Sequence, residues 1–325
     1  MSVECSGSHR SGRAWQLALT SQLTRAILPA VKPPRSRDAP QFPIVEVFGY
    51  NVAAATAGAK MAAAERSCPF AGNACEKFQQ YKYGYCSVGY AAQDDNGERS
   101  TYAVCDHRLD GAPVSRAVID HFGSNPNVRL VPEIVLTRPR TSFDYAAFTE
   151  TNGAIGDVIA IETQAIDIRG GGVGPAWRAW EEGKPDEWRR YFTSEARQKG
   201  RKDTVAYGVN MANIYKRLGL QVAEKGAFLK RIGVPFYVVM QDRPFKYLRS
   251  RIPFEEVSRG GDITFMTSDY TGRTNRDGTM EFTHRQTVRT SLSNYVTAMN
   301  KGSRAESSDR AHFLERIKGK ANLGK

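Results

Sequence analysis

The sequence predicts an α/β protein of the α+β type with a small, loop-rich region that holds four cysteines. Alternating apolar residues indicate strands, as at 42–50, and an alanine-rich stretch at 53–65 indicates a helix. Four of the five cysteines fall between residues 68 and 105. With 325 residues, 41% of them hydrophobic, the chain can bury the core of one large domain or two small ones.

Four regions follow one another along the chain. Residues 1–42 are rich in Ser, Arg and Pro, which predicts a disordered or mis-assigned amino-terminal tail. The cysteine region takes residues 43–120, a larger folded region takes 121–300, and a basic tail takes 301–325. No run of about 18 apolar residues occurs, so we expect a soluble protein without a membrane-spanning helix.

The formal net charge of +12 favours polyanionic partners. DNA, RNA and acidic membranes all fit, because phosphate neutralisation gives affinity without reading sequence. Basic residues are dense between positions 189 and 217, where a solvated basic face is the alternative interpretation. Charge alone therefore selects a class of partner and no particular one.

The four clustered cysteines indicate a structural site. They are Cys68, Cys75, Cys86 and Cys105, whereas Cys5 lies in the tail. No secretory signal is evident, and in a reducing compartment such a cluster more often binds metal than forms disulfides. The spacing lacks paired Cys-x-x-Cys motifs, so two disulfides or ordinary buried thiols stay open. Four thiolates would suit zinc or iron.

A hairpin in the larger region places two carboxylates together. The Asn152-Gly153 pair between two strand-like segments is a strong turn signal. A hairpin centred on Gly153 pairs residues whose numbers sum to 306, which sets Asp144 opposite Glu162. Opposite residues have Cβ atoms within about 5 Å, near enough to bind one divalent cation together.

Strand alternation puts Glu162 and Gln164 on an otherwise apolar face. A buried carboxylate without a partner is unfavourable, and a metal ion beside a DNA phosphate would relieve that cost. The alternative is a carboxylate satisfied by a nearby Arg or by backbone donors.

Short motifs resemble the amino-terminal metal region of NotI/EagI-type restriction endonucleases: Glu46-Val47-Phe48-Gly49-Tyr50-Asn51, Cys68-Pro69-Phe70, Cys75, Gly84-Tyr85-Cys86 and Val104-Cys105. Further motifs resemble that family's variant of the PD-(D/E)xK nuclease site, in which Gln replaces the usual Lys: Ser142-Phe143-Asp144 and Glu162-Thr163-Gln164. The stretch from Gly208 to Arg217 is similar to a helical segment of the family. The likeness runs from Glu46 to Leu218.

This resemblance implies a type II site-specific deoxyribonuclease from a prokaryotic cytoplasm. It implies a mixed central β-sheet flanked by helices, with the PD-(D/E)xK nuclease core in residues 121–300. It also implies a homodimer that cuts double-stranded DNA at a GC-rich palindrome, with GGCC as the common core of family targets. Iron in the four-cysteine site comes from the resemblance, since thiolate chemistry alone favours zinc. A cognate methyltransferase is expected, though not as a stable partner.

The resemblance also suggests roles for single residues. Asp144 and Glu162 would coordinate Mg²⁺, and Gln164 would orient the attacking water or a metal ligand. Glu133 resembles a further acidic ligand, with a surface glutamate as the alternative. Asp167 falls on the opposite face by alternation and is left out of the catalytic set.

DNA contacts are predicted at Lys216 and Arg217, which end a recognisable motif inside the basic stretch. Two other functions stay open. A non-catalytic, metal-stapled DNA-binding regulator would explain the charge and the cysteines but not the carboxylates. A repair or structure-selective nuclease would use the same core without a palindromic target.

Overall fold

The computed structural model describes residues 41–91, 98–170, 172–202, 205, 207–301 and 307–320. The predicted tail at 1–42 lies outside the described residues apart from its last two positions. The predicted tail at 301–325 includes a helix, α10 (Ser307–Lys320). No helix in these described ranges is long and apolar enough to cross a membrane.

A six-stranded mixed sheet forms the centre of the larger region, in the order β14-β13-β12-β9-β8-β7. Its strands are β7 (Val128–Thr137), β8 (Arg140–Thr151), β9 (Ala154–Gln164), β12 (Phe236–Gln241), β13 (Ile263–Thr274) and β14 (Met280–Thr290). Strand β12 runs parallel to both β9 and β13, and the other neighbours are antiparallel. The central β12 is buried along its whole length, as expected for a strand covered on both faces.

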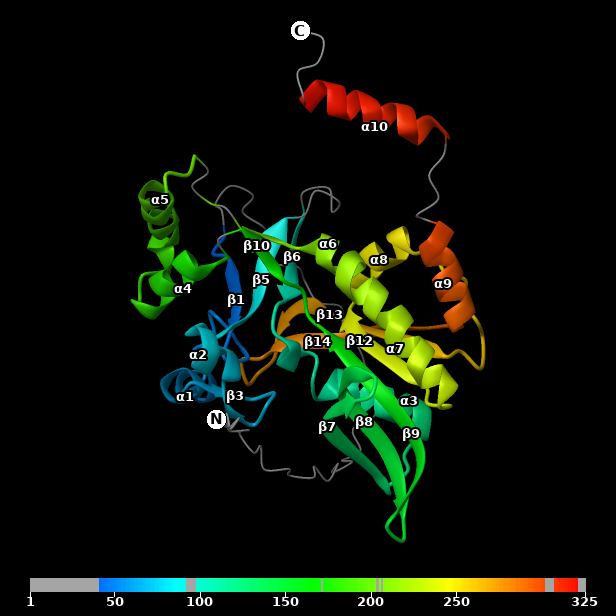
Figure 1. The fold of residues 1–325 in the computed structure, drawn as a ribbon. Coiled ribbons are helices and arrows are strands. Elements are labelled where there is room, and N and C mark those ends of the chain that lie inside the picture. Colours follow the sequence, from blue (N-terminus) through cyan, green and yellow to red (C-terminus); the bar gives the residue numbers. More distant parts are fainter. Residues whose placement is uncertain are drawn as a thin grey trace, which may run out of the picture.

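Helices cover both faces of this sheet (Figure 1). On one face, α3 (Ala112–Phe122) packs Val114 and Val118 against β9, β12 and β13. The other face is covered by three helices, α7 (Gly219–Arg231), α8 (Asp242–Arg251) and α9 (Leu292–Lys301). The expected mixed α/β architecture with a central mixed sheet flanked by helices is confirmed. Helix α3 spans residue 120, where we placed a region boundary.

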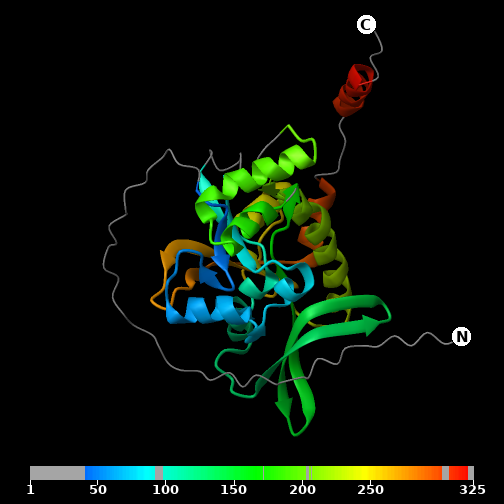
Figure 2. The same cartoon turned by 90° about the vertical axis from the view of Figure 1, so that its left-hand side faces the viewer.

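The β8–β9 hairpin turns at Asn152 and Gly153, as the sequence predicts. Both residues have positive φ angles, 51° and 78°, which suit a two-residue hairpin turn. Beyond the helices the hairpins of β7, β8 and β9 project from the body (Figures 1 and 2). The first four residues of β9 are exposed there, whereas the strand is buried from Ile159 to Thr163. The buried half of β9 therefore lies in the body of the protein.

The cysteine region is built on a second sheet of four strands, in the order β2-β1-β5-β6. Its elements are β1 (Ile44–Val47), β2 (Tyr50–Asn51), α1 (Ala57–Glu65), β3 (Ser67–Cys68), β4 (Asn73–Ala74), α2 (Glu76–Tyr81), β5 (Tyr85–Ala91), β6 (Arg99–Ala103) and a 3₁₀ turn (Asp106–Arg108). The Thr56 hydroxyl caps α1 by accepting the backbone N–H of Ala59 at 3.2 Å. Cys68 lies on β3, Cys75 directly precedes α2, and Cys86 lies on β5.

A buried ion pair within the cysteine region contacts two strands of the central sheet. Glu46 of β1 is fully buried and accepts the Nε–H of Arg108 at 3.1 Å. Tyr270 of β13 donates its hydroxyl to the same carboxylate at 2.6 Å, and Arg108 also donates to the carbonyl of Met280 at 2.7 Å. Because every partner is satisfied, the pair can persist in the interior, and it fixes the cysteine region to the central sheet.

The remaining elements connect β9 to α7. They are β10 (Ile168–Gly170), α4 (Gly174–Glu181), a 3₁₀ turn (Pro185–Glu187), α5 (Trp188–Gln198), β11 (Tyr207–Val209), α6 (Met211–Asn213) and a π-helical turn (Ile214–Leu218) that runs into α7. Strands β10 and β11 pair antiparallel. The motif at 208–217 therefore begins as a strand, and only its second part is helical.

Candidate active site and thiolate cluster

The register of β8 against β9 leads to Asp144 and Glu162. The ladder pairs Phe148 with Val158 and continues to Tyr145 with Ile161. The ladder ends there; continued by one residue, the same register would set Asp144 opposite Glu162, the pair that a sum of 306 predicts. The two carboxylates are close enough to interact electrostatically. Both come from the buried base of the hairpin and not from its exposed tip.

The Asp144 side chain turns toward β9. In a regular strand, side chains two residues apart lie on the same face of the sheet. Phe143 packs on the α7 side and Tyr145 on the α3 side, so β8 is irregular between these two residues. The Oδ2 atom of Asp144 accepts the backbone N–H of Thr163 at 2.7 Å and the Thr163 hydroxyl at 3.0 Å. These two bonds hold the carboxylate at the strand end.

Glu162 is buried, with 8% of its surface exposed, and it contacts a lysine from another element. Lys225 of α7 donates its Nζ–H to Oε1 of Glu162 at 2.5 Å. The pKa of Glu162 is raised to about 7, because burial and the Asp144 carboxylate raise it more than Lys225 lowers it. Lys225 was not among the residues predicted from sequence, because α7 lies far along the chain from β9.

The second oxygen of Glu162 has no partner. Its Oε2 atom is buried and makes no hydrogen bond. A buried carboxylate oxygen without a donor costs free energy, so such an atom in a folded protein calls for a ligand or a function. The carboxylate of Asp144 beside it cannot supply a proton donor when ionised. A divalent cation between them would satisfy both groups.

A third carboxylate, missed from sequence, reaches the same strand end. Asp106 accepts the backbone N–H of Ala165 through its Oδ1 atom at 2.9 Å. Although the residue as a whole is exposed, loss of solvent around the carboxyl group raises its pKa, and the nearby Asp144 raises it further. Asp106 follows Cys105 directly, and it was therefore counted with the cysteine region.

Gln164 and Glu133 occupy different surroundings. The side-chain amide of Gln164 donates to the carbonyl of Ala165 at 2.6 Å. Glu133 is exposed on the edge strand β7, with a φ of 53° that departs from strand geometry. The pairs on either side of it, Pro132 with Tyr145 and Ile134 with Phe143, set its backbone level with Asp144. The assignment of Gln164 and Glu133 to catalysis stays a prediction.

The four predicted thiols gather around Cys68. This thiol interacts electrostatically with the sulfur groups of Cys75, Cys86 and Cys105. All four are free thiols; Cys68, Cys75 and Cys86 are buried and Cys105 is half-buried. The fold thus brings together residues that are up to 37 positions apart in the sequence.

Backbone N–H groups point at three of these sulfurs. Gly49 donates to Cys86 Sγ at 3.2 Å, Phe70 and Ala71 donate to Cys68, and His107 donates to Cys105. Such donors stabilise a thiolate more than a neutral thiol. Burial has the opposite effect: it raises the pKa of Cys86 well above its ordinary value and that of Cys105 to about 12.

A thiolate metal site would reconcile these donors with the burial, because a bound cation would offset the burial of four negative sulfurs. Within the described ranges, no group of three or more His, Cys, Asp or Glu side chains has the spacing of a formed metal site. The donor set at the four cysteines nevertheless fits Fe or Zn.

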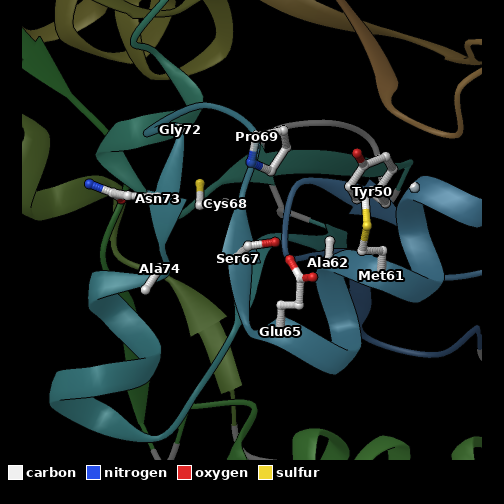
Figure 3. Close-up of a pocket in the computed structure, with 11 residues that line it drawn as sticks. Tyr50, Met61, Ala62, Glu65, Ser67, Cys68, Pro69, Gly72, Asn73 and Ala74 are labelled. Carbon is white, nitrogen blue, oxygen red and sulfur yellow. The ribbon is translucent and has the colours of Figure 1, made fainter.

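A hollow of about 450 Å³ lies beside the thiolate cluster, between α1 and the β3–β4 hairpin (Figure 3). Cys68, Tyr50 and Met61 border it, and Glu65 is the one carboxylate among its described lining residues. A hollow with a single carboxylate does not provide the paired oxygen ligands of a divalent-cation site. Neither Asp144 nor Glu162 lines this hollow, so it is separate from the candidate active site.

Lys216 and Arg217 lie in the π-helical turn before α7, and both are exposed. Arg217 forms a long contact of 3.4 Å with Asp167, whose carboxylate also accepts the amide of Asn213 at 2.9 Å. The Asp167 carboxylate thus contacts two side chains of the segment that leads into α7. The two basic side chains are accessible to a polyanion.

No protein-family model matches the sequence, and a comparison with curated proteins finds no match. The resemblance to NotI/EagI-type restriction endonucleases therefore depends on the short motifs quoted above and not on overall similarity.

Proposed function

We propose that this protein is a type II restriction endonuclease that hydrolyses double-stranded DNA with Mg²⁺. The observation that carries the proposal is the buried, unpartnered Oε2 atom of Glu162, which lies beside the Asp144 carboxylate at the end of β9. Carboxylate oxygens are the ligands that Mg²⁺ prefers. The motif resemblance gives the same assignment to the same two residues.

Bound Mg²⁺ would supply Lewis-acid chemistry, by polarising the scissile phosphate and lowering the pKa of a water ligand. The protein's own side chains hold and orient the two carboxylates. Thr163 fixes the Asp144 carboxylate through two hydrogen bonds, and Lys225 fixes one oxygen of Glu162. The Lys225 ammonium also compensates negative charge at a site that must accept a DNA phosphate, a charge that Gln164 cannot provide.

Gln164 orients the attacking water or a metal ligand through its amide in this proposal, and Glu133 is a further acidic ligand. For Gln164 this requires the amide to leave the Ala165 carbonyl when DNA binds. Glu133 is exposed at the level of Asp144 on the neighbouring strand, where it is accessible to a ligand at the sheet edge.

Fe or Zn would be held by Cys68, Cys75, Cys86 and Cys105 and would have a structural role, because four thiolates leave no open coordination position. The short strands β3 and β4 and the loops around them bury little apolar surface, so a metal would stabilise this segment.

DNA as the partner is supported by the net charge of +12 and by the exposed Lys216 and Arg217. In this proposal two copies form a symmetric homodimer, with one active site for each strand of a GC-rich palindrome built around GGCC. A methyltransferase of the same specificity would protect the host DNA.

Incubation of the purified protein with Mg²⁺ and a GC-rich plasmid tests this function. We expect discrete fragments, which a site-specific endonuclease produces. Smears or cleavage confined to branched junctions would contradict the proposal and favour a repair or structure-selective nuclease. Retarded but intact DNA would also contradict it and would favour a non-catalytic DNA-binding regulator.

A further inference from the structure

Asp106 is held at the same strand end as Glu162. Its Oδ1 atom accepts the backbone N–H of Ala165 at 2.9 Å. Ala165 comes directly after Gln164, the last residue of β9. Ala165 is three residues beyond Glu162 on the same chain segment, so its backbone N–H fixes the Asp106 carboxylate near Glu162. Asp106 itself belongs to the 3₁₀ turn that follows the last cysteine.

The segment that carries Asp106 is anchored to two strands of the central sheet. The carbonyl of Ala103 accepts the backbone N–H of Ile166 at 3.0 Å, just past the end of β9. The backbone N–H of Ala103 donates to Oε1 of Gln241 at 3.0 Å, and the amide of Gln241 donates to the carbonyl of Thr101 at 2.7 Å. Gln241 is the buried last residue of β12, the neighbour of β9. Asp106 therefore has a defined place beside the site.

Three carboxylates act on one another at this strand end. Asp106 and Asp144 both interact electrostatically with Glu162, and Asp144 also interacts with Asp106. Lys225 contacts one oxygen of Glu162, and the other oxygen is buried without a partner. Converging like charges are unfavourable unless a cation lies between them, and the unpartnered Glu162 oxygen independently indicates a missing ligand.

We infer that Asp106 is a third carboxylate of the divalent-cation site formed with Asp144 and Glu162, and that the thiol-bearing segment delivers it there. This inference rests on the proposed nuclease function. Cys105 and Asp106 are adjacent in sequence, so one peptide unit links the thiolate cluster to the active site. The cysteine region thus supplies one ligand of the nuclease site in addition to its structural role.

Calorimetric titration of the purified full-length protein with Ca²⁺, without DNA, tests the inference. Ca²⁺ takes carboxylate oxygens and not thiolates, so the four cysteines do not contribute to its binding. The Asp106→Asn variant keeps an oxygen for the Ala165 N–H and loses only the charge. We expect it to bind Ca²⁺ at least about tenfold more weakly than the wild type, with an unchanged melting temperature.

Two further variants separate a ligand from a structural residue. Asp106→Glu keeps the charge and should retain most of the Ca²⁺ affinity, and the exposed Glu256→Gln control should bind like the wild type. Wild-type affinity in Asp106→Asn together with weak binding in Glu162→Gln would overturn the inference and leave the proposed function standing. Wild-type affinity in both Asp106→Asn and Glu162→Gln would overturn the cation site itself.

Discussion

Acidification should weaken divalent-cation binding by this protein about ninetyfold between about pH 8 and about pH 5. A cation at the end of β9 requires the ionised form of Glu162. Burial and the neighbouring Asp144 raise the pKa of this carboxyl group to about 7. Protons and the cation therefore compete for one side chain across this pH range, and affinity falls as the pH falls.

The magnitude follows from that pKa. Competition by one proton multiplies the dissociation constant by one plus the ratio of proton concentration to the acid constant. For a pKa of about 7, this factor is about 1.1 at pH 8 and about 100 at pH 5. A glutamate with the ordinary pKa of 4.5 would change the dissociation constant by only about 1.3-fold over the same range.

Calorimetric titration with Ca²⁺ at several pH values measures this dependence, and the Glu162→Gln variant shows how much of it other carboxyl groups cause. The wild type should lose affinity steeply below about pH 7, and the variant should bind weakly at every pH. A wild-type affinity that changes less than about twofold from pH 8 to pH 5 would refute the assignment of Glu162 as a buried cation ligand.

Three further perturbations test other parts of the structure. Lys225→Met leaves Glu162 buried without an opposite charge, and it should lower the free energy of unfolding, measured in urea, by about 3 kcal/mol. Lys225→Arg keeps the charge and should keep most of that stability. A Met variant as stable as the wild type would contradict the ion pair. Cys86→Ser should reduce both the bound Fe or Zn, measured by elemental analysis, and the melting temperature; an unchanged melting temperature would argue against a metal that stabilises the fold. Lys216→Ala and Arg217→Ala should each weaken DNA binding and reduce the slope of log affinity against log salt by about one, and an unchanged slope would remove that residue from the phosphate contacts.

Local signals in the sequence predicted much of the fold. The Asn152-Gly153 pair predicted the β8–β9 hairpin, the alternation at 42–50 predicted β1, and the alanine-rich stretch at 53–65 predicted α1. Each of these signals is contained in a few adjacent residues, so a single sequence is sufficient to find it.

The predicted sum of 306 holds in the hairpin only because of a β-bulge that the sequence did not reveal. At the tip, Thr151 pairs with Ala154, which gives a sum of 305. A bulge between Phe148 and Glu150 adds one residue, and the sum of 306 then holds down to Tyr145. Without this bulge, Asp144 would lie opposite another residue.

Lys225 and Asp106 could not be predicted because their contacts depend on tertiary packing. Lys225 reaches Glu162 only because α7 lies across the face of β9, 63 residues further along the chain. Asp106 reaches Ala165 only because β6 ends beside β9 and β12, 59 residues away. The clustering of the four cysteines in the sequence predicted that they share one site, whereas the backbone donors to their sulfurs depend on turns that only the structure shows.

The most direct measurement is Mg²⁺-dependent plasmid cleavage by Glu162→Gln, compared with the wild type and the exposed Glu256→Gln control. With DNA binding and melting behaviour intact, the Glu162 variant should cut at least about a thousandfold more slowly, equivalent to about 4 kcal/mol of lost transition-state stabilisation. A variant that is well folded and still cuts at the wild-type rate would show that phosphodiester hydrolysis does not depend on the carboxylates at the end of β9.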